Sequence, residues 1–226
     1  MTTLSQPKFS GTGKMPCPSW SLPAWLTCPG AADADGKPVE ACSRCYALTG
    51  HYQRGNVQAL RNHNLSDHKL PDWVDAMVPA IRDNTYFRWF DSGDVYTVDL
   101  ALKIEQVCIR TPRTKHWIPT RARKDASILP HLLRIGALPN VVVRHSSDGI
   151  NGEELQGFEH TSTIVQRPED ARLGNGAGLC TAYLREGKCG SCRACWSKTC
   201  KLMAYPIHGV SVSQKTIDRL NPLRNL

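Results

Sequence analysis

The stretch YFRWFDSGDVYTVDLALKIEQVCIRTPRTKHWIPTRAR, residues 86–123, predicts one complete strand–helix–strand unit. Residues 86–90 are aromatic and apolar, as in a short buried strand, and they run into the polar turn DSGD. Residues 98–110 predict a helix, which the following Thr-Pro pair stops. Residues 115–119 predict a second strand that ends in a basic turn. Two strands joined through a helix are typical of a parallel sheet.

A further helix is predicted on each side of this unit. Before it, residues 71–83 place apolar side chains four residues apart on one helix face, with Asp72 as the expected N-cap. After it, residues 125–136 predict a helix that begins at the cap Asp125 and is kinked by Pro130.

Two more strands are predicted beyond these helices. Residues 140–147 contain three consecutive valines, and residues 161–165 have the composition of a fourth strand. Strand starts near 86, 115, 140 and 161 are about one strand–helix unit apart, which predicts an α/β fold with a parallel sheet. Four units are too few for a complete eight-stranded barrel. The sequence therefore predicts either a partial (β/α) barrel or an open, mostly parallel sheet, with Cys-rich loops before and after it.

Polar and charged side chains follow the expected end of each of the first three strands. They are Asp91, Ser92 and Asp94, then Thr120, Arg121 and Arg123, then Arg144, His145, Ser146, Ser147 and Asp148. In both architectures the functional site lies at the carboxyl ends of the strands. We expect a ligand pocket there, and the candidates for its lining and for catalysis are Asp91, Asp94, Arg121 and Arg144. Arginine in such a pocket suits a carboxylate or a phosphate. The sequence assigns no reaction to these residues.

Composition and charge narrow the class of protein. No apolar run approaches the roughly 20 residues of a membrane helix, and the N-terminus lacks the apolar region of a signal peptide. We therefore expect a cytoplasmic protein that does not engage a membrane. The net charge of +8 favours an acidic partner such as nucleic acid, and the densest basic stretch is RTPRTKHWIPTRARK, residues 110–124. A solubilising surface charge is the alternative interpretation.

Cysteine is more abundant than packing requires. The ten cysteines are at positions 17, 28, 42, 45, 108, 180, 189, 192, 195 and 200. In a reducing compartment, closely spaced cysteines more often bind metal or perform redox chemistry than form disulfides. Cys108 falls between apolar neighbours in a predicted helix, and we expect it in the core.

The densest cysteine group is CGSCRACWSKTC, which starts at Cys189. Its C-x2-C-x2-C run resembles the ligand run of bacterial ferredoxins, in which successive thiolates bind the corners of a 4Fe–4S cubane. Cys189, Cys192 and Cys195 would supply three ligands, and the spacing leaves Cys180 and Cys200 both open as the fourth. Zinc is the alternative metal, although four-cysteine zinc sites usually use two separated C-x2-C pairs.

The N-terminal cysteine group is less compact. Cys28, Cys42 and Cys45 could hold a second cubane with one iron left without a protein ligand. Enzymes that generate radicals from S-adenosylmethionine bind this cosubstrate at such an open iron. Their compact C-x3-C-x2-C loop is absent here. The alternative is that these cysteines, with Cys17, complete a structural metal site.

Seven stretches of the chain carry a family resemblance. They are KMPCPSWSLPA at 14–24, ACSRCYALTGHY at 41–52, YFRWFDSGDV at 86–95, HWIPTRA at 116–122, NVVVRHSS at 140–147, TSTIV at 161–165 and CGSCRACWS at 189–197. Through them the chain resembles the gene product 88 family of tailed phages. The family pattern implies cysteines matching Cys28, Cys42, Cys45, Cys180, Cys189, Cys192 and Cys195, which favours Cys180 as the fourth ligand. The order of elements is also remotely similar to phage proteins with a GCxxCYA motif, which resemble barrel-fold radical enzymes.

These observations predict a single domain over residues 1–226. An irregular Cys-rich segment extends to residue 70, the βα units occupy 71–170, and a Cys-rich cluster segment occupies 171–226. The leading hypothesis is an iron–sulfur phage protein of the host cytoplasm with a redox or radical role. It would carry a 4Fe–4S cluster on the C-terminal cysteines and could carry a second on the N-terminal ones. Its partner would be a redox protein or a small-molecule substrate, with S-adenosylmethionine as a candidate cosubstrate.

The alternative hypothesis is a zinc-stabilised basic module. Such a module would bind nucleic acid or a host protein and would need no catalytic residue. Arg121, Arg123 and Lys124 would contact phosphates. Its affinity for nucleic acid would fall steeply as salt rises, which distinguishes it from an iron–sulfur enzyme.

Overall fold

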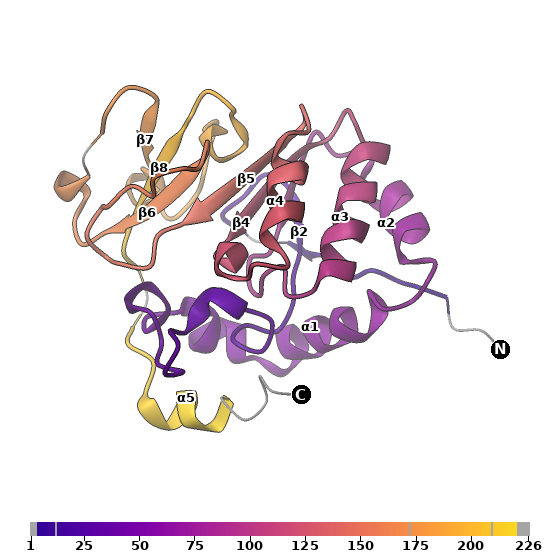
Figure 1. Cartoon of the computed structure of the whole chain (residues 1–226), viewed down its shortest axis with the longest axis horizontal. Coiled ribbons are helices and arrows are strands. Elements are labelled where there is room, and N and C mark those ends of the chain that lie inside the picture. The colour runs from indigo at the N-terminus through magenta and orange to yellow at the C-terminus, as the bar shows by residue number, and fades with distance from the viewer. Residues whose placement is uncertain (1–3, 12, 172, 209, 221–226) are drawn as a thin grey trace.

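The computed structural model describes residues 4–11, 13–171, 173–208 and 210–220, and these contain one eight-stranded sheet with helices packed against it (Figure 1). The strands are β1 (Ser10–Gly11), β2 (Pro18–Trp20), β3 (Tyr86–Trp89), β4 (Lys115–Thr120), β5 (Val141–Ser146), β6 (Thr161–Val165), β7 (Ala177–Leu179) and β8 (Leu202–Pro206). The helices are α1 (Gly55–Asp67), α2 (Trp73–Ile81), α3 (Val98–Arg110), α4 (Leu129–Gly136) and α5 (Gln214–Leu220).

The strands of the sheet follow the order β1-β2-β3-β4-β5-β6-β8-β7, and every neighbouring pair except β1–β2 is parallel. From β2 to β6, each new strand joins the same edge. Because crossovers between parallel strands are right-handed, steady progress in one direction keeps the crossover helices on one face. The sheet stays open and does not close into a barrel, which confirms an open, mostly parallel sheet as the architecture.

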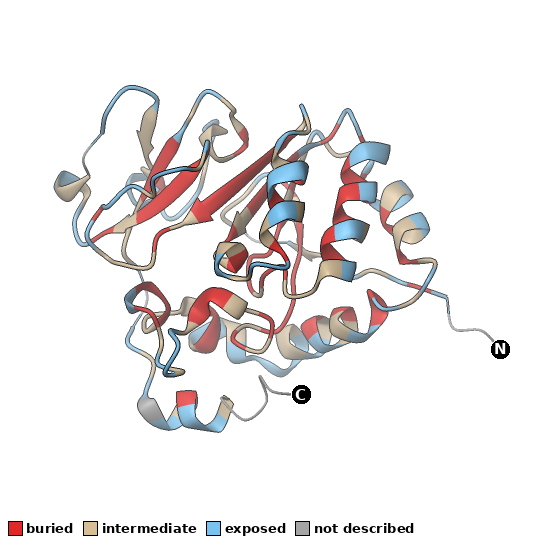
Figure 2. Ribbon diagram, viewed as in Figure 1, coloured by how far each residue is buried: buried red, intermediate tan, exposed pale blue. Residues whose placement is uncertain are grey.

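One face of the sheet packs against α2, α3 and α4 and forms the main core. Phe87 and Trp89 of β3, Ile118 of β4, and Val141 and Val143 of β5 point to this face. The apolar side chains predicted on one face of α2 are fully buried there. Figure 2 shows the matching pattern on α3 and α4, whose buried side turns to the sheet and whose exposed side turns to solvent. Cys108 is fully buried in this core, as expected.

The other face of the sheet is covered by the two Cys-rich segments. Trp117 of β4 packs on Trp196, with ring centroids 5.3 Å apart, and Cys17 joins the same small cluster. Trp196 also donates from its indole nitrogen to the backbone oxygen of Phe87, at 2.9 Å. This contact seats the C-terminal cysteine loop on the middle of the sheet.

The elements predicted from periodicity agree with the structure within a residue or two. The helix expected over 98–110 is α3, and the four expected strands are β3, β4, β5 and β6. The helix expected over 125–136 is shorter, because α4 begins at Leu129. Pro130 then stands in the first turn, where its missing N–H has no intrahelical partner to lose, so the predicted kink at Pro130 is wrong.

The two predicted caps act elsewhere. Asp125 accepts hydrogen bonds from the backbone N–H groups of Ser127 and Ile128, so it holds the turn before α4 rather than α4 itself. Asp72 precedes α2 but makes no capping hydrogen bond. Its carboxylate instead accepts a hydrogen bond from the backbone N–H of Ser5, at 2.9 Å. This contact holds the N-terminal chain beside the start of α2.

Part of the predicted irregular segment is a helix. The buried residues of α1 are Arg61, Asn64 and Asp67, all polar, so hydrophobic periodicity gives no sign of this helix. Asn64 donates from its side chain to the backbone oxygens of Lys8 and Ser21, which fixes α1 against the N-terminal chain.

Residues 24–53 fold as short 3₁₀ turns at the carboxyl ends of β3, β4 and β5. The backbone N–H of Ala41 donates to the backbone oxygen of Asp148, and the Tyr46 hydroxyl donates to that of Asp91. The N-terminal cysteine segment therefore packs beside the residues that follow β3 and β5.

Within the described ranges, no helix is both long and apolar enough to cross a membrane.

Candidate functional site

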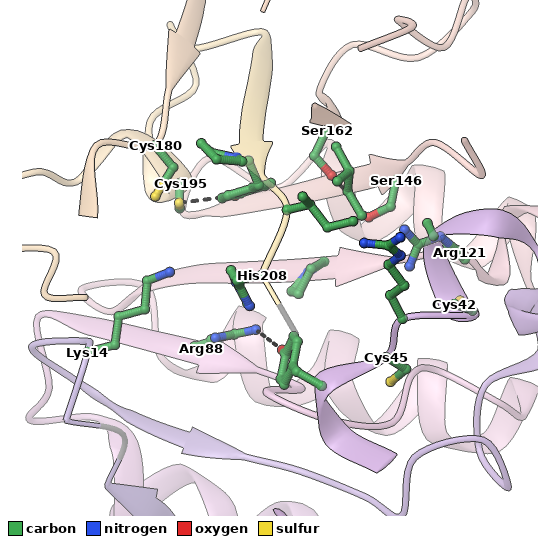
Figure 3. Close-up of a pocket in the computed structure, with 18 of the residues that line it drawn as sticks. Lys14, Cys42, Cys45, Arg88, Arg121, Ser146, Ser162, Cys180, Cys195 and His208 are labelled. Carbon is green, nitrogen blue, oxygen red and sulfur yellow. Dashed lines mark hydrogen bonds between the residues drawn. The ribbon is translucent and has the colours of Figure 1, made fainter. Parts of the chain in front are cut away.

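A cavity of about 420 Å³ lies on the helix-free face of the sheet, between the two Cys-rich segments (Figure 3). Its floor comes from β3, β4, β5, β6 and β8, and consists of Arg88, Trp117, Pro119, Ser146, Ser162, Ile164 and Tyr205. Figure 3 shows Cys180 and Cys195 at one end and Cys42 and Cys45 at the other, with Arg88 between them. Cysteines that are far apart in sequence thus face one space.

The C-terminal cysteines lie near one another at one end of the cavity. Cys180, Cys189 and Cys195 line it, whereas Cys192 is exposed. Burial raises the pKa of Cys189, against the nearby positive charge of Lys14, and the neighbouring Cys180 and Cys192 raise it further. These four are the cysteines predicted to ligate a cluster.

Cys195 has a specific polar partner. Its Sγ lies 3.2 Å from the hydroxyl of Tyr205 on β8. Burial raises the pKa of Cys195 to about 11, and the hydrogen bond with Tyr205 acts in the opposite direction. A donor aimed at a cysteine sulfur stabilises a thiolate once the proton has left.

The two candidates for the fourth ligand have different environments. Cys180 lines the cavity. Cys200 points its Sγ at the backbone oxygen of Leu202, 3.4 Å away, and is not part of the cavity wall. The structure therefore brings Cys180, and not Cys200, to the other C-terminal thiols.

The N-terminal cysteines form a second group. Cys28, Cys42 and Cys45 pack in one hydrophobic cluster around Trp25 and Leu48. All three line a smaller hollow of about 150 Å³ that adjoins the cavity and shares part of its wall. Burial raises the pKa of Cys45 to about 11 and that of Cys28 well above its usual range. Buried neutral thiols facing a hollow are available as ligands once deprotonated.

Cys17 belongs to the C-terminal group and not to the N-terminal one with which its sequence position associates it. It packs against Trp196 in the cluster that also includes Cys195. Burial raises the pKa of Cys17 to about 11, and Cys189 is among the neighbours that contribute.

The described cysteines do not form a ready-made site for one metal ion. Among the described residues, no three Cys, His, Asp or Glu side chains converge closely enough to hold a single ion. A tetrahedral zinc needs four donors at about 2.3 Å from one point. The thiolates of a cubane bind four different irons and therefore stand further apart.

Three of the four strand-end candidates line the hollow: Asp91, Asp94 and Arg121. The Asp91 carboxylate accepts from the Ser21 hydroxyl and lies 3.8 Å from the Arg61 guanidinium. The Asp94 carboxylate accepts from the backbone N–H groups of Arg121 and Val95, both at 2.7 Å. Burial raises the pKa of Asp94 to about 6.

Arg144, the fourth candidate, lies elsewhere. It is fully buried and lines neither the cavity nor the hollow. Its guanidinium donates to four backbone oxygens, those of Thr161, Ala194, Cys200 and Lys201. Arg144 thus ties the C-terminal cysteine loop to β5 and β6 and is not available to a ligand.

The predicted phosphate contacts converge on one carboxylate. Arg121, Arg123 and Lys124 place nitrogens 3.9, 3.1 and 2.7 Å from the Asp148 carboxylate. Arg121 also donates to the backbone oxygen of Ser147. Three cations thus share one carboxylate, so only part of the charge of this basic stretch is paired within the chain.

The sequence analysis missed several residues of the cavity, among them Tyr46, Arg88, Tyr205 and His208. They come from three separate segments, so no local motif joins them. Arg88 did leave a signal, because it is the single charged residue inside the strand sequence YFRWF. A single arginine in an otherwise apolar strand, on the face opposite the core, indicates that this face borders a polar site.

Comparison with known proteins gives one match. A family model described as gene product 88 matches residues 1–198. The matched range contains both cysteine groups apart from Cys200. No curated protein and no solved structure matches the chain.

Proposed function

The chain belongs to the gene product 88 family, a family of phage gene products, and we propose that it is an iron–sulfur protein whose cysteine-lined cavity serves a redox or radical reaction. Cys180, Cys189, Cys192 and Cys195 are the proposed ligands of a 4Fe–4S cluster. The observation that carries the proposal is that free thiols from both Cys-rich segments face one cavity on the helix-free side of the sheet.

The surroundings of these thiols support a cluster. A cubane supplies one-electron chemistry, and its potential depends on hydrogen bonds to sulfur and on shielding from water. Tyr205 offers a hydrogen bond to Cys195, and Trp196 covers the loop from the side of the sheet. Arg88 and Lys14 place positive charge near Cys17 and Cys189, which partly offsets the rise in the pKa of these thiols that burial causes.

Anaerobic purification followed by an absorption spectrum and by iron, sulfide and zinc analysis tests the proposal. A broad brown absorption with about four irons and four sulfides per chain is expected for one cluster, and about eight of each for two. A colourless protein with stoichiometric zinc would contradict it and would favour the zinc-stabilised binding module.

Matched cysteine variants locate the ligands. Cys192→Ala should lose one cluster's iron, whereas Cys108→Ala, in the core on the other face of the sheet, should retain all of it. Cys180→Ser should lose more iron than Cys200→Ser, because only Cys180 reaches the cavity. Equal iron content within either pair would contradict the assignment.

We also propose a second cluster on Cys28, Cys42 and Cys45, with one iron open to S-adenosylmethionine. The supporting observation is that these three thiols share a hollow with Asp91, Asp94 and Arg121. Addition of S-adenosylmethionine to the reduced protein should then change its electron paramagnetic resonance spectrum, and Cys45→Ala should abolish that change. An unchanged spectrum in the wild-type protein would remove the cosubstrate from the proposal.

A further inference from the structure

The charges around the cavity are strongly unbalanced. Its described lining contains four cationic side chains and no carboxylate: the cations are Lys14, Arg44, Arg88 and Arg121. Among the described residues, the ion pairs to carboxylates include Arg121 but none of the other three. A cavity wall of one charge sign concentrates ligands of the opposite sign.

Arg88 is the least satisfied of these cations. Its Nε is buried and has no hydrogen-bond partner among the described residues. Its other two nitrogens reach only the thioether sulfur of Met15, at 3.5 Å, and the hydroxyl of Tyr46, at 3.4 Å. Thioether sulfur is a weak acceptor, and the Tyr46 hydroxyl already donates to a backbone oxygen. A guanidinium that has left bulk water with so few acceptors is costly unless a ligand completes it.

The position of Arg88 is fixed by its neighbours. Its guanidinium carbon lies 4.6 Å from the ring centroid of Trp117, which holds the planar group against the cavity floor. Figure 3 places it between the two pairs of labelled cysteines, with Lys14 and His208 beside it. Burial lowers the pKa of His208, and the nearby charges of Lys14 and Arg88 lower it further, so these cations share one region of the cavity.

The nearby carboxylate does not satisfy Arg88. Asp91 is engaged by the Ser21 hydroxyl and by Arg61, 3.8 Å away. Nor do the other arginines compete for the same role, since Arg121 is held by Ser147 and Asp148, and Arg144 by backbone oxygens. Of these arginines, Arg88 therefore has the N–H donors most available to an anion that enters the cavity.

We propose that this cavity binds a small anionic molecule and holds its phosphate or carboxylate group on Arg88, between the two cysteine groups. A planar guanidinium matches both groups through paired N–H donors. The volume of about 420 Å³ is that of a site for a metabolite-sized molecule. Only the role of this molecule as a substrate or cosubstrate rests on the proposed function; the binding of the anion does not.

Calorimetric titration of the purified full-length chain with inorganic phosphate, pyrophosphate and citrate tests the inference, at constant ionic strength because salt screens exposed charges. At least one of these probes should bind with one site per chain. Arg88→Met should weaken that binding by about tenfold to a hundredfold, as expected for loss of a charge-assisted hydrogen bond. Arg82→Met, which removes the same charge at the exposed end of α2, should leave it unchanged.

A second variant keeps the test decisive if Arg88→Met folds poorly. Lys14→Met removes a cation at the rim of the cavity, while the backbone oxygen of Lys14 still accepts from Cys189. It should weaken binding by a smaller factor. Absence of saturable binding of all three probes in the millimolar range would overturn the inference, as would equal affinity in the Arg88 and Arg82 variants. Iron and sulfide content, measured on the same samples, reports separately on the proposed function.

One outcome would reassign Arg88. If Arg88→Met lost its iron but kept the anion affinity of the wild-type protein, the guanidinium would serve to balance the charge of a cluster. The anion site on Arg88 would then be rejected.

Discussion

Two carboxylates follow β3 three residues apart, and their surroundings give them different properties. Asp91 lies 3.8 Å from the guanidinium of Arg61. Asp94 is buried and accepts hydrogen bonds from the Thr120 side chain and from two backbone N–H groups. Burial is the larger effect on the pKa of Asp94, because these hydrogen bonds do not offset the loss of water around the charge.

The stability of the protein should therefore depend on pH through Asp94. Its pKa is raised to about 6 in the folded chain from an unfolded value of 3.8, so the neutral form stabilises the fold. This contribution is fully present below the unfolded pKa and is lost as pH rises through the folded pKa. Between pH 4 and pH 7 the wild-type protein should lose about 1–3 kcal/mol of unfolding free energy relative to Asp94→Asn.

Urea unfolding of both proteins across this pH range measures the difference. Asp83→Asn, which removes an exposed carboxylate after α2, is the matched control and should follow the wild-type curve. Parallel curves for the wild type and Asp94→Asn would contradict the assignment of this pH dependence to Asp94.

At the scale of elements, the N-terminal cysteine segment depends on one close backbone approach. A Cβ on Gly30 would lie on the backbone oxygen of Arg121, far inside the normal contact distance. The turn that carries Gly30 also directly follows Cys28, so this contact sets how deeply the N-terminal cysteines sit over β4. Only a residue without a side chain allows the segment to pack there.

Gly30→Ala should destabilise the fold by about 1–3 kcal/mol, the usual cost of forcing extra volume into a packed contact. Gly55→Ala at the start of α1 is the control, because a Cβ there meets nothing within 4 Å. It should be neutral or slightly stabilising, since alanine favours helix over glycine. Denaturant unfolding of the two variants gives the comparison, and a loss no larger for Gly30→Ala than for Gly55→Ala would show that the segment can shift freely.

The elements found from the sequence are those whose burial leaves a periodic pattern. α3 and β5 bury apolar residues at regular spacing, so their bounds were predicted to within a residue. α1 buries polar residues and β8 follows an irregular cysteine loop, so neither had such a pattern. The site was predicted only in part. Asp91, Asp94 and Arg121, which line the hollow, follow strands, whereas Arg88 and His208 of the cavity become neighbours only after folding.

At the scale of the whole molecule, Arg144 joins parts of the chain that are otherwise separate. Its hydrogen bonds reach the start of β6, the loop around Ala194 and the residues just before β8. Arg144→Met would remove four hydrogen bonds from the guanidinium, although the oxygens of Ala194 and Lys201 would keep a backbone N–H donor. We expect it to lower the unfolding free energy by about 1–3 kcal/mol, the usual cost of losing buried hydrogen bonds to a charged group.

Loss of the Arg144 contacts should also loosen the C-terminal cysteine loop. Limited proteolysis should then cleave Arg144→Met within residues 186–201 earlier than the wild-type protein. Arg110→Met, which breaks an exposed ion pair between α3 and Asp75, should cost less than about 1 kcal/mol and leave the cleavage pattern unchanged. Similar cleavage of all three proteins would mean that other contacts hold the loop.

The position of β8 between β6 and β7 has a consequence for how the protein is made. A ribosome releases β6 and β7 before β8, yet among the described strands β7 pairs with β8 alone, so the nascent chain carries an unfinished sheet edge until residues 202–206 emerge. Tyr205 and the backbone oxygens that anchor Arg144 arrive at the same late stage. The cavity is therefore completed only after residues 202–206 have left the ribosome, and whatever the cell loads into it must be delivered after that point.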